Sequence, residues 1–129
     1  MQMASEIHVI TAKKRVAYEK GLKAEERAAR MLEGHGYEIL SRRYRSPVGE
    51  IDLVAARGAQ LAFVEVKARR TLDDAAWSVT PRQQKRIVNA AGYWLQDYPE
   101  YSECDMSFDA ILFAPQHMAH IPGAFVAEV

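Results

Sequence analysis

Apolar positions recur every three or four residues between about residues 14 and 33, which is the period of a helix with one buried stripe. Small residues such as Ala17, Gly21 and Ala28 dominate this stripe, so the pattern predicts a helix that lies close against a sheet. The helix is expected to end at Gly34, because glycine suits a left-handed C-terminal cap.

Three strand-like segments follow this helix. Residues 36–45 alternate weakly between apolar and polar side chains and end close to a proline, which favours an edge strand. Residues 50–55 and 61–68 are rich in strand-forming residues, and the glycine-containing loop between them is typical of a hairpin. Together these segments predict a three-stranded meander.

A second helix is predicted to begin after Thr80, a good N-cap that is followed by proline at the first helical position and by Gln83, which can complete a capping box. Residues 97–105 have the composition of a loop, whereas residues 107–114 and 123–129 have that of strands. A strand, helix and strand in this order favour a parallel, right-handed connection. The whole pattern therefore predicts an α/β protein with a mixed central sheet flanked by helices.

The chain of 129 residues is expected to form a single domain, because it is long enough for one core and too short for two. We expect residues 1–12 to be a poorly ordered N-terminal extension. The sequence has no apolar run near the roughly 18 residues that span a bilayer and no signal-peptide pattern, so we expect a cytoplasmic protein without membrane contact. The single cysteine, Cys104, excludes an internal disulfide and a multi-cysteine zinc site.

Charge is distributed unevenly along a chain whose net charge is zero. Residues 1–86 contain all 17 Lys and Arg with 11 acids, a net charge of +6, and residues 87–129 contain six acids and no base, a net charge of −6. The basic half can attract a polyanion, but the two halves can equally attract each other or a second subunit. Charge asymmetry alone does not choose between these interpretations.

Polar side chains interrupt the two central strands near one end. Because side chains in a strand alternate between faces, Asp52 is expected opposite Ile51 and Leu53, and Glu65 and Lys67 are expected to share one face of the next strand. The hairpin would then bring the two acids within reach of each other. Like charges in contact repel, so a cation between them would remove a conflict in the fold.

Mg²⁺ is a suitable cation, because it prefers oxygen ligands and is commonly held by one or two carboxylates with water and phosphate. The carbonyl of Val66 is a further candidate ligand. Lys67 could orient or deprotonate a water, or stabilise charge on a phosphate oxygen. Acids in strands usually face solvent, and a purely structural role stays open for each residue taken alone. Their combination favours a metal-dependent phosphodiester site.

The order of these motifs resembles the PD-(D/E)xK nuclease superfamily, whose restriction-endonuclease-like core is α-β-β-β-α-β. The residues that carry this resemblance are Glu25 in the first helix, GEIDL at 49–53, FVEVK at 63–67 and TxxxQ at 80–84. Most of the chain is similar, more narrowly, to the YraN-like bacterial proteins of uncharacterised protein family 0102, and archaeal Holliday junction resolvases follow the same order. The narrower similarity rests on GxxAExxA at 21–28, GYxIL at 36–40, YRxxxGEIDL at 44–53, FVEVKxR at 63–69 and GAF at 123–125.

This resemblance implies roles for individual residues. Asp52 and Glu65 would hold Mg²⁺ or Mn²⁺, and Lys67 would act on water or on the transition state. Glu25, which helical periodicity places at the edge of the apolar stripe, would be an auxiliary acid, and Gln84 would be a further site residue. The sequence leaves the role of Glu50, on the same strand as Asp52, undefined.

The basic half of the chain also predicts a nucleic-acid interface. Tyr44 and Trp77 lie near basic residues in the sequence and could stack on bases, although an interior position is equally compatible with an aromatic side chain. No base-reading helix is evident, so contacts to phosphates without sequence specificity are expected. The residues expected at the interface are Arg42, Arg43, Arg45, Arg69, Arg70, Arg82, Lys85 and Arg86.

The sequence supports two hypotheses about function. The first is a metal-dependent endonuclease, similar to Holliday junction resolvases, that acts on DNA or structured nucleic acid, with a homodimer as a suitable arrangement because cutting both strands takes two sites. The second is a non-catalytic nucleic-acid-binding module in a repair, recombination or DNA-uptake assembly. His117 and His120 are expected on the surface, because prolines at 115 and 122 argue against a helix that would present both to one metal.

Overall fold

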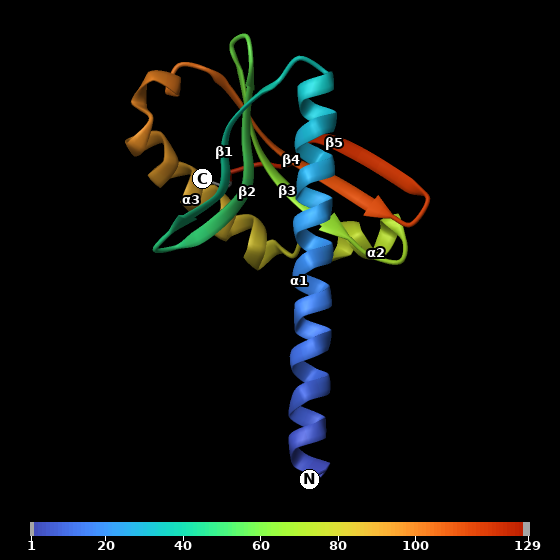
Figure 1. Cartoon of the computed structure of the whole chain (residues 1–129). Helices are drawn as coiled ribbons and strands as arrows, with labels where there is room; N and C mark the ends of the chain where they lie inside the picture. Colours follow the sequence, from blue (N-terminus) through green and yellow to red (C-terminus); the bar gives the residue numbers. More distant parts are fainter. Residues whose placement is uncertain (1, 128–129) are drawn as a thin grey trace.

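Figure 1 shows a computed structural model of the chain, which describes the backbone of residues 2–127 and the side chains of residues 14–127. The predicted order α-β-β-β-α-β is confirmed, with an additional short helix, and the final strand, predicted over residues 123–129, spans His117–Phe125 instead. Residues 1–12, predicted to be a poorly ordered extension, lie outside the residues whose side chains are described, so this expectation stays a prediction. The elements are α1 Gln2–Gly34, β1 Glu38–Ser46, β2 Gly49–Arg57, β3 Gln60–Ala68, α2 Leu72–Trp77, α3 Pro81–Asp97, a 3₁₀ turn Pro99–Tyr101, β4 Asp105–Ala114 and β5 His117–Phe125.

The five strands form one mixed sheet in the order β1-β2-β3-β4-β5. β1, β2 and β3 pair antiparallel as the predicted meander, β4 lies parallel to β3, and β5 returns antiparallel to β4. Gly58, with φ 59°, occupies the first central position of the tight turn between Arg57 and Gln60. A positive φ at this position is typical of a type II′ hairpin turn and is unfavourable for residues with a Cβ atom.

α1 covers one face of the sheet with the second half of its length (Figure 1). Ala24, Ala28 and Leu32 are buried there against β-strand residues that include Val64 and Ile111. The small side chains allow close approach, as the sequence pattern predicts. Every described side chain from 14 to 23 is exposed, because the helix projects beyond the sheet. The predicted apolar stripe is therefore buried only from Ala24 onward. No described helix is both long and apolar enough to cross a membrane.

α3 covers the opposite face of the sheet. Ile87 and Trp94 are buried against Ile51 and Phe63, and the Trp94 ring meets the Phe63 ring edge-on with centroids 5.8 Å apart. The indole Nε1 of Trp94 donates to Ser41 Oγ at 2.8 Å, so its one polar atom is satisfied inside the core. The helix begins as predicted after Thr80, whose hydroxyl oxygen accepts from the backbone N–H of the third helical residue at 3.2 Å.

α2 lies between β3 and α3, in a segment for which the sequence pattern predicts no helix or strand. Thr71 caps the helix by accepting from Asp74 N at 3.0 Å, and Ala75 packs against Ala110 and Leu112 of β4. Six residues make fewer than two helical turns, so hydrophobic periodicity cannot reveal such a helix. α2 extends the cover of the α3 face over β4.

A substitution at Gly49 should separate the sheet from α3. A Cβ atom on this buried glycine would lie 2.8 Å from the carbonyl oxygen of Arg86, a backbone atom that cannot move alone. We expect Gly49→Ala to lower the free energy of unfolding by about 1–3 kcal/mol, as measured by urea denaturation. Gly92→Ala, in α3 with no atom within 4 Å of the new Cβ, is the control and should stabilise the protein by about 0.5–1 kcal/mol. Equal stability of Gly49→Ala and wild type would contradict this close approach.

Candidate active site

β2 and β3 separate at the end of the hairpin that carries the polar residues. Their pairing ends at Leu53 with Val64, although β2 extends back to Gly49. At the next position Asp52 Oδ2 accepts from the backbone N–H of Val66 at 2.8 Å. The Asp52 carboxylate thus replaces the backbone carbonyl of a paired strand as the acceptor for Val66 N–H. It lies in the gap between β2 and β3.

The separation changes the side-chain pattern of β2. Ile51 belongs to the core under α3 and Leu53 to the core under α1, so the prediction that they share a face is wrong. In the neighbouring strand β1, Arg43 has φ 53°, a left-handed conformation that is unusual for a non-glycine residue. The pleat is interrupted at Asp52, because β2 loses β3 on one side and meets a distorted β1 on the other.

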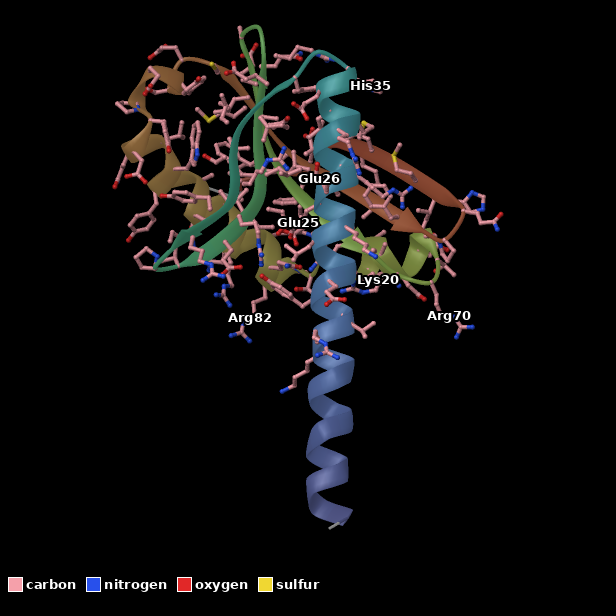
Figure 2. The ribbon with its side chains drawn as sticks, in the orientation of Figure 1. Lys20, Glu25, Glu26, His35, Arg70 and Arg82 are labelled. Atoms are coloured by element: carbon pink, nitrogen blue, oxygen red, sulfur yellow. The ribbon has the colours of Figure 1, made fainter. Side chains whose placement is uncertain are left out.

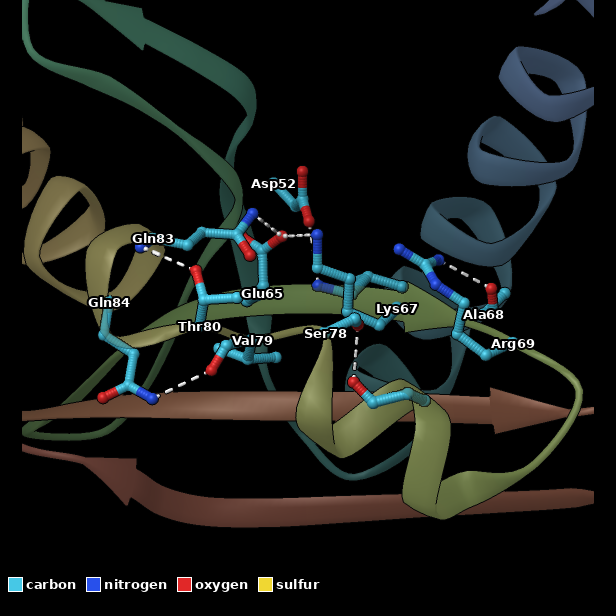
Figure 3. A network of polar contacts seen from close by, with 12 residues as sticks. Asp52, Glu65, Lys67, Ala68, Arg69, Ser78, Val79, Thr80, Gln83 and Gln84 are labelled. Carbon is cyan, nitrogen blue, oxygen red and sulfur yellow. Dashed lines mark hydrogen bonds and ion pairs between the residues drawn. The ribbon is translucent and has the colours of Figure 1, made fainter.

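Glu65 and Lys67 lie on the face of β3 that α3 covers. Only 5% of Glu65 is exposed, and its Oε1 lies 3.2 Å from Lys67 Nζ. The same oxygen accepts from Gln83 Nε2 at 3.1 Å (Figure 3). A buried carboxylate with two donors, one of them charged, is well held in place.

Glu25 reaches this group from α1. Its carboxylate Oε2 lies 3.6 Å from Arg43 Nε, and its side chain is 18% exposed. Burial, followed by repulsion from Asp52, raises the pKa of Glu25 to about 7, and the charge of Arg43 opposes this rise. Asp52 of β2 therefore interacts with Glu25 of α1 and with Glu65 of β3 around the gap.

The two central acids have perturbed pKa values with identifiable causes. Burial raises the pKa of Asp52, while the hydrogen bond from Val66 N–H and the charge of Lys67 lower it. Burial and then the charge of Asp52 raise the pKa of Glu65 to about 8, against the lowering effect of Lys67. Both acids are therefore harder to ionise than free carboxyl groups in the absence of a further cation.

The donor set can be compared with the needs of a metal ion. Among the side chains of residues 14–127, no three His, Cys, Asp or Glu lie close enough together to hold a metal by themselves. Asp52 and Glu65 provide two carboxylates, and the carbonyl of Val66, the residue after Glu65, is the predicted backbone ligand. One or two carboxylates with water and substrate phosphate are a usual set for Mg²⁺, so these residues fit a hard divalent cation.

A cavity of about 640 Å³ opens beside the two carboxylates, between the start of β2 and the first turns of α3. Asp52 and Glu65 line it together with Gln83, and the guanidinium-bearing residues Arg82 and Arg86 contribute from α3. Acids that attract a cation and arginines that attract phosphate thus share one cavity. This combination suits a ligand that carries both a metal ion and a phosphate group.

The predicted basic residues are distributed over three environments. Arg42 pairs with Glu26 at 3.0 Å, and Arg45 pairs with Glu50 at 3.2 Å. Glu50 lines the cavity, but its exposed carboxylate is held by Arg45. Arg43 is the cation beside Glu25, and Arg82 and Arg86 line the cavity. The other predicted basic residues are exposed: Arg69, Arg70 and Lys85.

Gln83 occupies the place that the sequence assigns to Gln84. The Gln84 amide turns away from the acids and donates to the carbonyl of Val79 at 3.0 Å, whereas Gln83 donates to Glu65 (Figure 3). The prediction of contact between Gln84 and the site is therefore corrected. One residue rotates a helical side chain by about 100°, and the angle at which α3 meets the sheet decides which of the two faces β3.

Replacement of Gln83 with Ala should weaken the site without unfolding it. Loss of a donor to buried Glu65 leaves its carboxylate less stabilised, so we expect at least a several-fold loss of Mg²⁺ affinity, measured by calorimetry. Gln84→Ala is the matched control, since the Gln84 amide donates to the backbone carbonyl of Val79, which precedes α3, and not to an acid of the site. Equal Mg²⁺ affinity in the two variants would show that the Gln83 contact has no effect on the acids.

One predicted surface residue is half-buried instead. His120 Nε2 lies 2.9 Å from Asp109 Oδ2, and Asp109 Oδ1 accepts from Gly123 N at 3.1 Å. Only 1% of Asp109 is exposed, so the histidine and the glycine satisfy an acid inside β4. The expectation that both histidines lie free on the surface holds for His117 alone.

The fold and the arrangement of acids together define a mixed α/β protein with a restriction-endonuclease-like core. A family model described as uncharacterised protein family UPF0102 matches residues 24–113. This chain belongs to that family.

Curated relatives with the name UPF0102 protein extend the match over most of the chain. A protein of Rhodopseudomonas palustris strain BisB18 is 52% identical over 122 residues, which cover 94% of this chain and 90% of the relative. One from Nitrobacter winogradskyi is 56% identical over 113 residues, 87% of this chain and 96% of the relative. One from Bradyrhizobium diazoefficiens is 51% identical over 125 residues, 96% and 94% of the two chains.

Proposed function

We propose that this protein is a metal-dependent endonuclease that hydrolyses phosphodiester bonds in DNA or structured nucleic acid, as Holliday junction resolvases do. The observation that carries the proposal is the meeting of Asp52, Glu65 and Lys67 where β2 and β3 separate, beside a cavity that arginines also line. A buried pair of repelling carboxylates is costly for a fold, and a function that requires a cation explains its presence.

Asp52 and Glu65, with the Val66 carbonyl, would hold Mg²⁺ or Mn²⁺. When bound, the ion would act as a Lewis acid on the phosphate and offset the repulsion between the two carboxylates. The ammonium of Lys67 lies 3.2 Å from Glu65, where it can orient a water and stabilise charge on a phosphate oxygen. Glu25 can hold or release a proton near neutral pH, since its pKa is raised to about 7.

Substrate binding is assigned to the basic residues around the cavity. Arg82 and Arg86, which line the cavity, would contact phosphates next to the scissile bond, and the exposed Arg69, Arg70 and Lys85 would make more distant contacts. Such contacts give affinity without sequence specificity and weaken steeply with salt. Cutting both strands would require two copies of the site, so a homodimer on the nucleic acid is part of the proposal.

A non-catalytic nucleic-acid-binding module is the second candidate. The observation that favours it is that Lys67 and Arg43 already lie next to Glu65 and Glu25, so the acids have cationic partners without a metal. Such a module would bind DNA in a salt-dependent way, and calorimetry would show no binding of Mg²⁺ or Mn²⁺. It would serve a repair, recombination or DNA-uptake assembly.

Cleavage assays distinguish the two candidates. Branched, flapped and linear DNA, and RNA of matched sequence, are incubated with the protein and Mg²⁺ or Mn²⁺, with EDTA as the control. We expect metal-dependent cleavage that EDTA abolishes. Salt-dependent binding of these substrates without cleavage under any metal condition would reject the endonuclease and leave the binding module.

A further inference from the structure

α2 lies directly beside the acid and lysine of the candidate site. In the parallel pairing of β3 with β4, Glu65 is in register with Ala110 and Lys67 with Leu112. Ala75 of α2 packs on those same two β4 residues. α2 therefore sits on the same face of the sheet as the Glu65 and Lys67 side chains, one strand away from them.

Trp77, the last residue of α2, is exposed. Its exposed fraction is 83%, whereas Trp94, the other tryptophan of the chain, is completely buried. The backbone next to Trp77 is fixed, because Ser78 N donates to the carbonyls of Asp74 and Ala75 at 3.1 and 3.2 Å. A tryptophan held on an ordered turn with its ring in solvent is outside the core and is available to a ligand.

The charges around Trp77 favour a polyanion as its ligand. Arg69 and Arg70 precede α2, Arg82 and Lys85 follow it, and all four are exposed. Figure 2 shows Arg70 and Arg82 reaching the same edge of the molecule, from which α1 projects. Asp73 and Asp74 of α2 are also exposed and lie on the Trp77 side of the helix, four and three residues before it, so the four bases outnumber two acids around Trp77. Tyr44, the other aromatic residue near the basic positions, is instead half-buried and donates to Asp97 Oδ2 at 2.8 Å.

We propose that Trp77 stacks on an unpaired base beside the cleavage site, so that the protein selects substrates in which a single-stranded segment adjoins the scissile phosphate. This inference rests on the proposed function, because it names the substrate class of the same site. An indole stacks on every base with similar strength, so it would select unpaired structure without reading sequence. Bases inside a continuous duplex are already stacked and have no free face for Trp77.

Tryptophan fluorescence tests this proposal without any cleavage. The wild-type protein in EDTA is titrated with a single-stranded oligothymidylate of about 12 nucleotides. This length lies within the roughly 4–16 nucleotides that one single-strand-binding domain covers. The controls are an abasic strand of equal length, which has the same phosphates without bases, and a continuous duplex. Trp77→Phe leaves only the buried Trp94 as a reporter, and so assigns the signal to Trp77.

We expect the thymidylate strand to quench wild-type fluorescence and the abasic strand and duplex to leave it nearly unchanged. Affinity for the thymidylate strand should fall roughly tenfold in Trp77→Ala and recover partly in Trp77→Phe, since phenylalanine also stacks. Circular dichroism checks that the variants fold. Equal quenching by the abasic strand, unchanged affinity in Trp77→Ala, or a spectral shift on concentrating the protein alone, which indicates contact with a second copy, would each overturn the proposal.

The result is independent of catalysis. Base-dependent quenching without metal-dependent cleavage would support stacking by Trp77 and reject the endonuclease. Cleavage of continuous duplex at the same rate as of flapped substrates, with no quenching, would support the endonuclease and reject the role of Trp77.

Discussion

Replacement of Lys67 with Met should lower the rate of metal-dependent cleavage by about two to four orders of magnitude. Lys67 is the one cation within 4 Å of the Glu65 carboxylate among the described residues, and methionine keeps a side chain of similar length without its charge. Substrate affinity should change little, since Lys67 is largely buried and other basic residues provide the exposed charge. Single-turnover cleavage and binding in EDTA measure the two effects separately.

Two further variants sharpen this test. Asp52→Asn retains an oxygen that can accept from Val66 N–H, so it should fold normally and lose cleavage to a similar extent. Lys85→Met, which removes an exposed lysine from α3, should leave the rate constant unchanged and reduce the salt dependence of binding by about one charge. Wild-type rates in both Lys67→Met and Asp52→Asn would reject the assignment of the site.

In the absence of divalent metal, the free energy of unfolding should fall as the pH rises from about 5 to about 8. Burial and the charge of Asp52 raise the pKa of Glu65 from 4.5 to about 8, so the folded state holds a proton that the unfolded state releases. The corresponding stability is fully present below pH 4.5 and is lost as the pH rises through 8. Asp52 and Glu25 shift in the same direction. The total decline should be on the order of a few kcal/mol.

Mg²⁺ should reverse this decline, because it binds the ionised carboxylates of the folded state. Thermal unfolding at pH 6 and pH 8, with Mg²⁺ or with EDTA, should show a larger Mg²⁺-induced rise of Tm at pH 8. Glu65→Gln should flatten the pH dependence and remove most of the Mg²⁺ effect, and Glu50→Gln, at an exposed carboxylate, should do neither. A Tm that Mg²⁺ leaves unchanged at both pH values would contradict a metal site at Asp52 and Glu65.

The two proposals make different demands on the same surface. The first proposal assigns chemistry on a phosphate to Lys67 and the acids where β2 and β3 separate, and the second assigns the choice of nucleic acid to exposed Trp77 and its basic neighbours. Under these proposals, catalysis would depend on the buried group and substrate choice on the exposed one. Variants of the two groups should therefore have separable effects on rate and on substrate preference.

The sequence by itself determined the order of the elements and the faces of most of their side chains. Hydrophobic period and capping residues are local properties, so they located the α1 stripe, the hairpin and the start of α3 at Thr80. Alternation along the hairpin strands also placed Asp52 near Glu65, and helical period placed Glu25 at the edge of its stripe. These inferences require only the identity of residues that are close to one another in the sequence.

Only the tertiary structure decided how these residues meet. The end of β2–β3 pairing at Leu53, the choice of Gln83 over Gln84 and the exposure of Trp77 depend on contacts between segments distant in the sequence. The angle of α3 on the sheet and the packing of α2 on β4 set these contacts. Local propensity cannot fix such geometry, because the same strand and helix patterns are compatible with more than one packing angle and register.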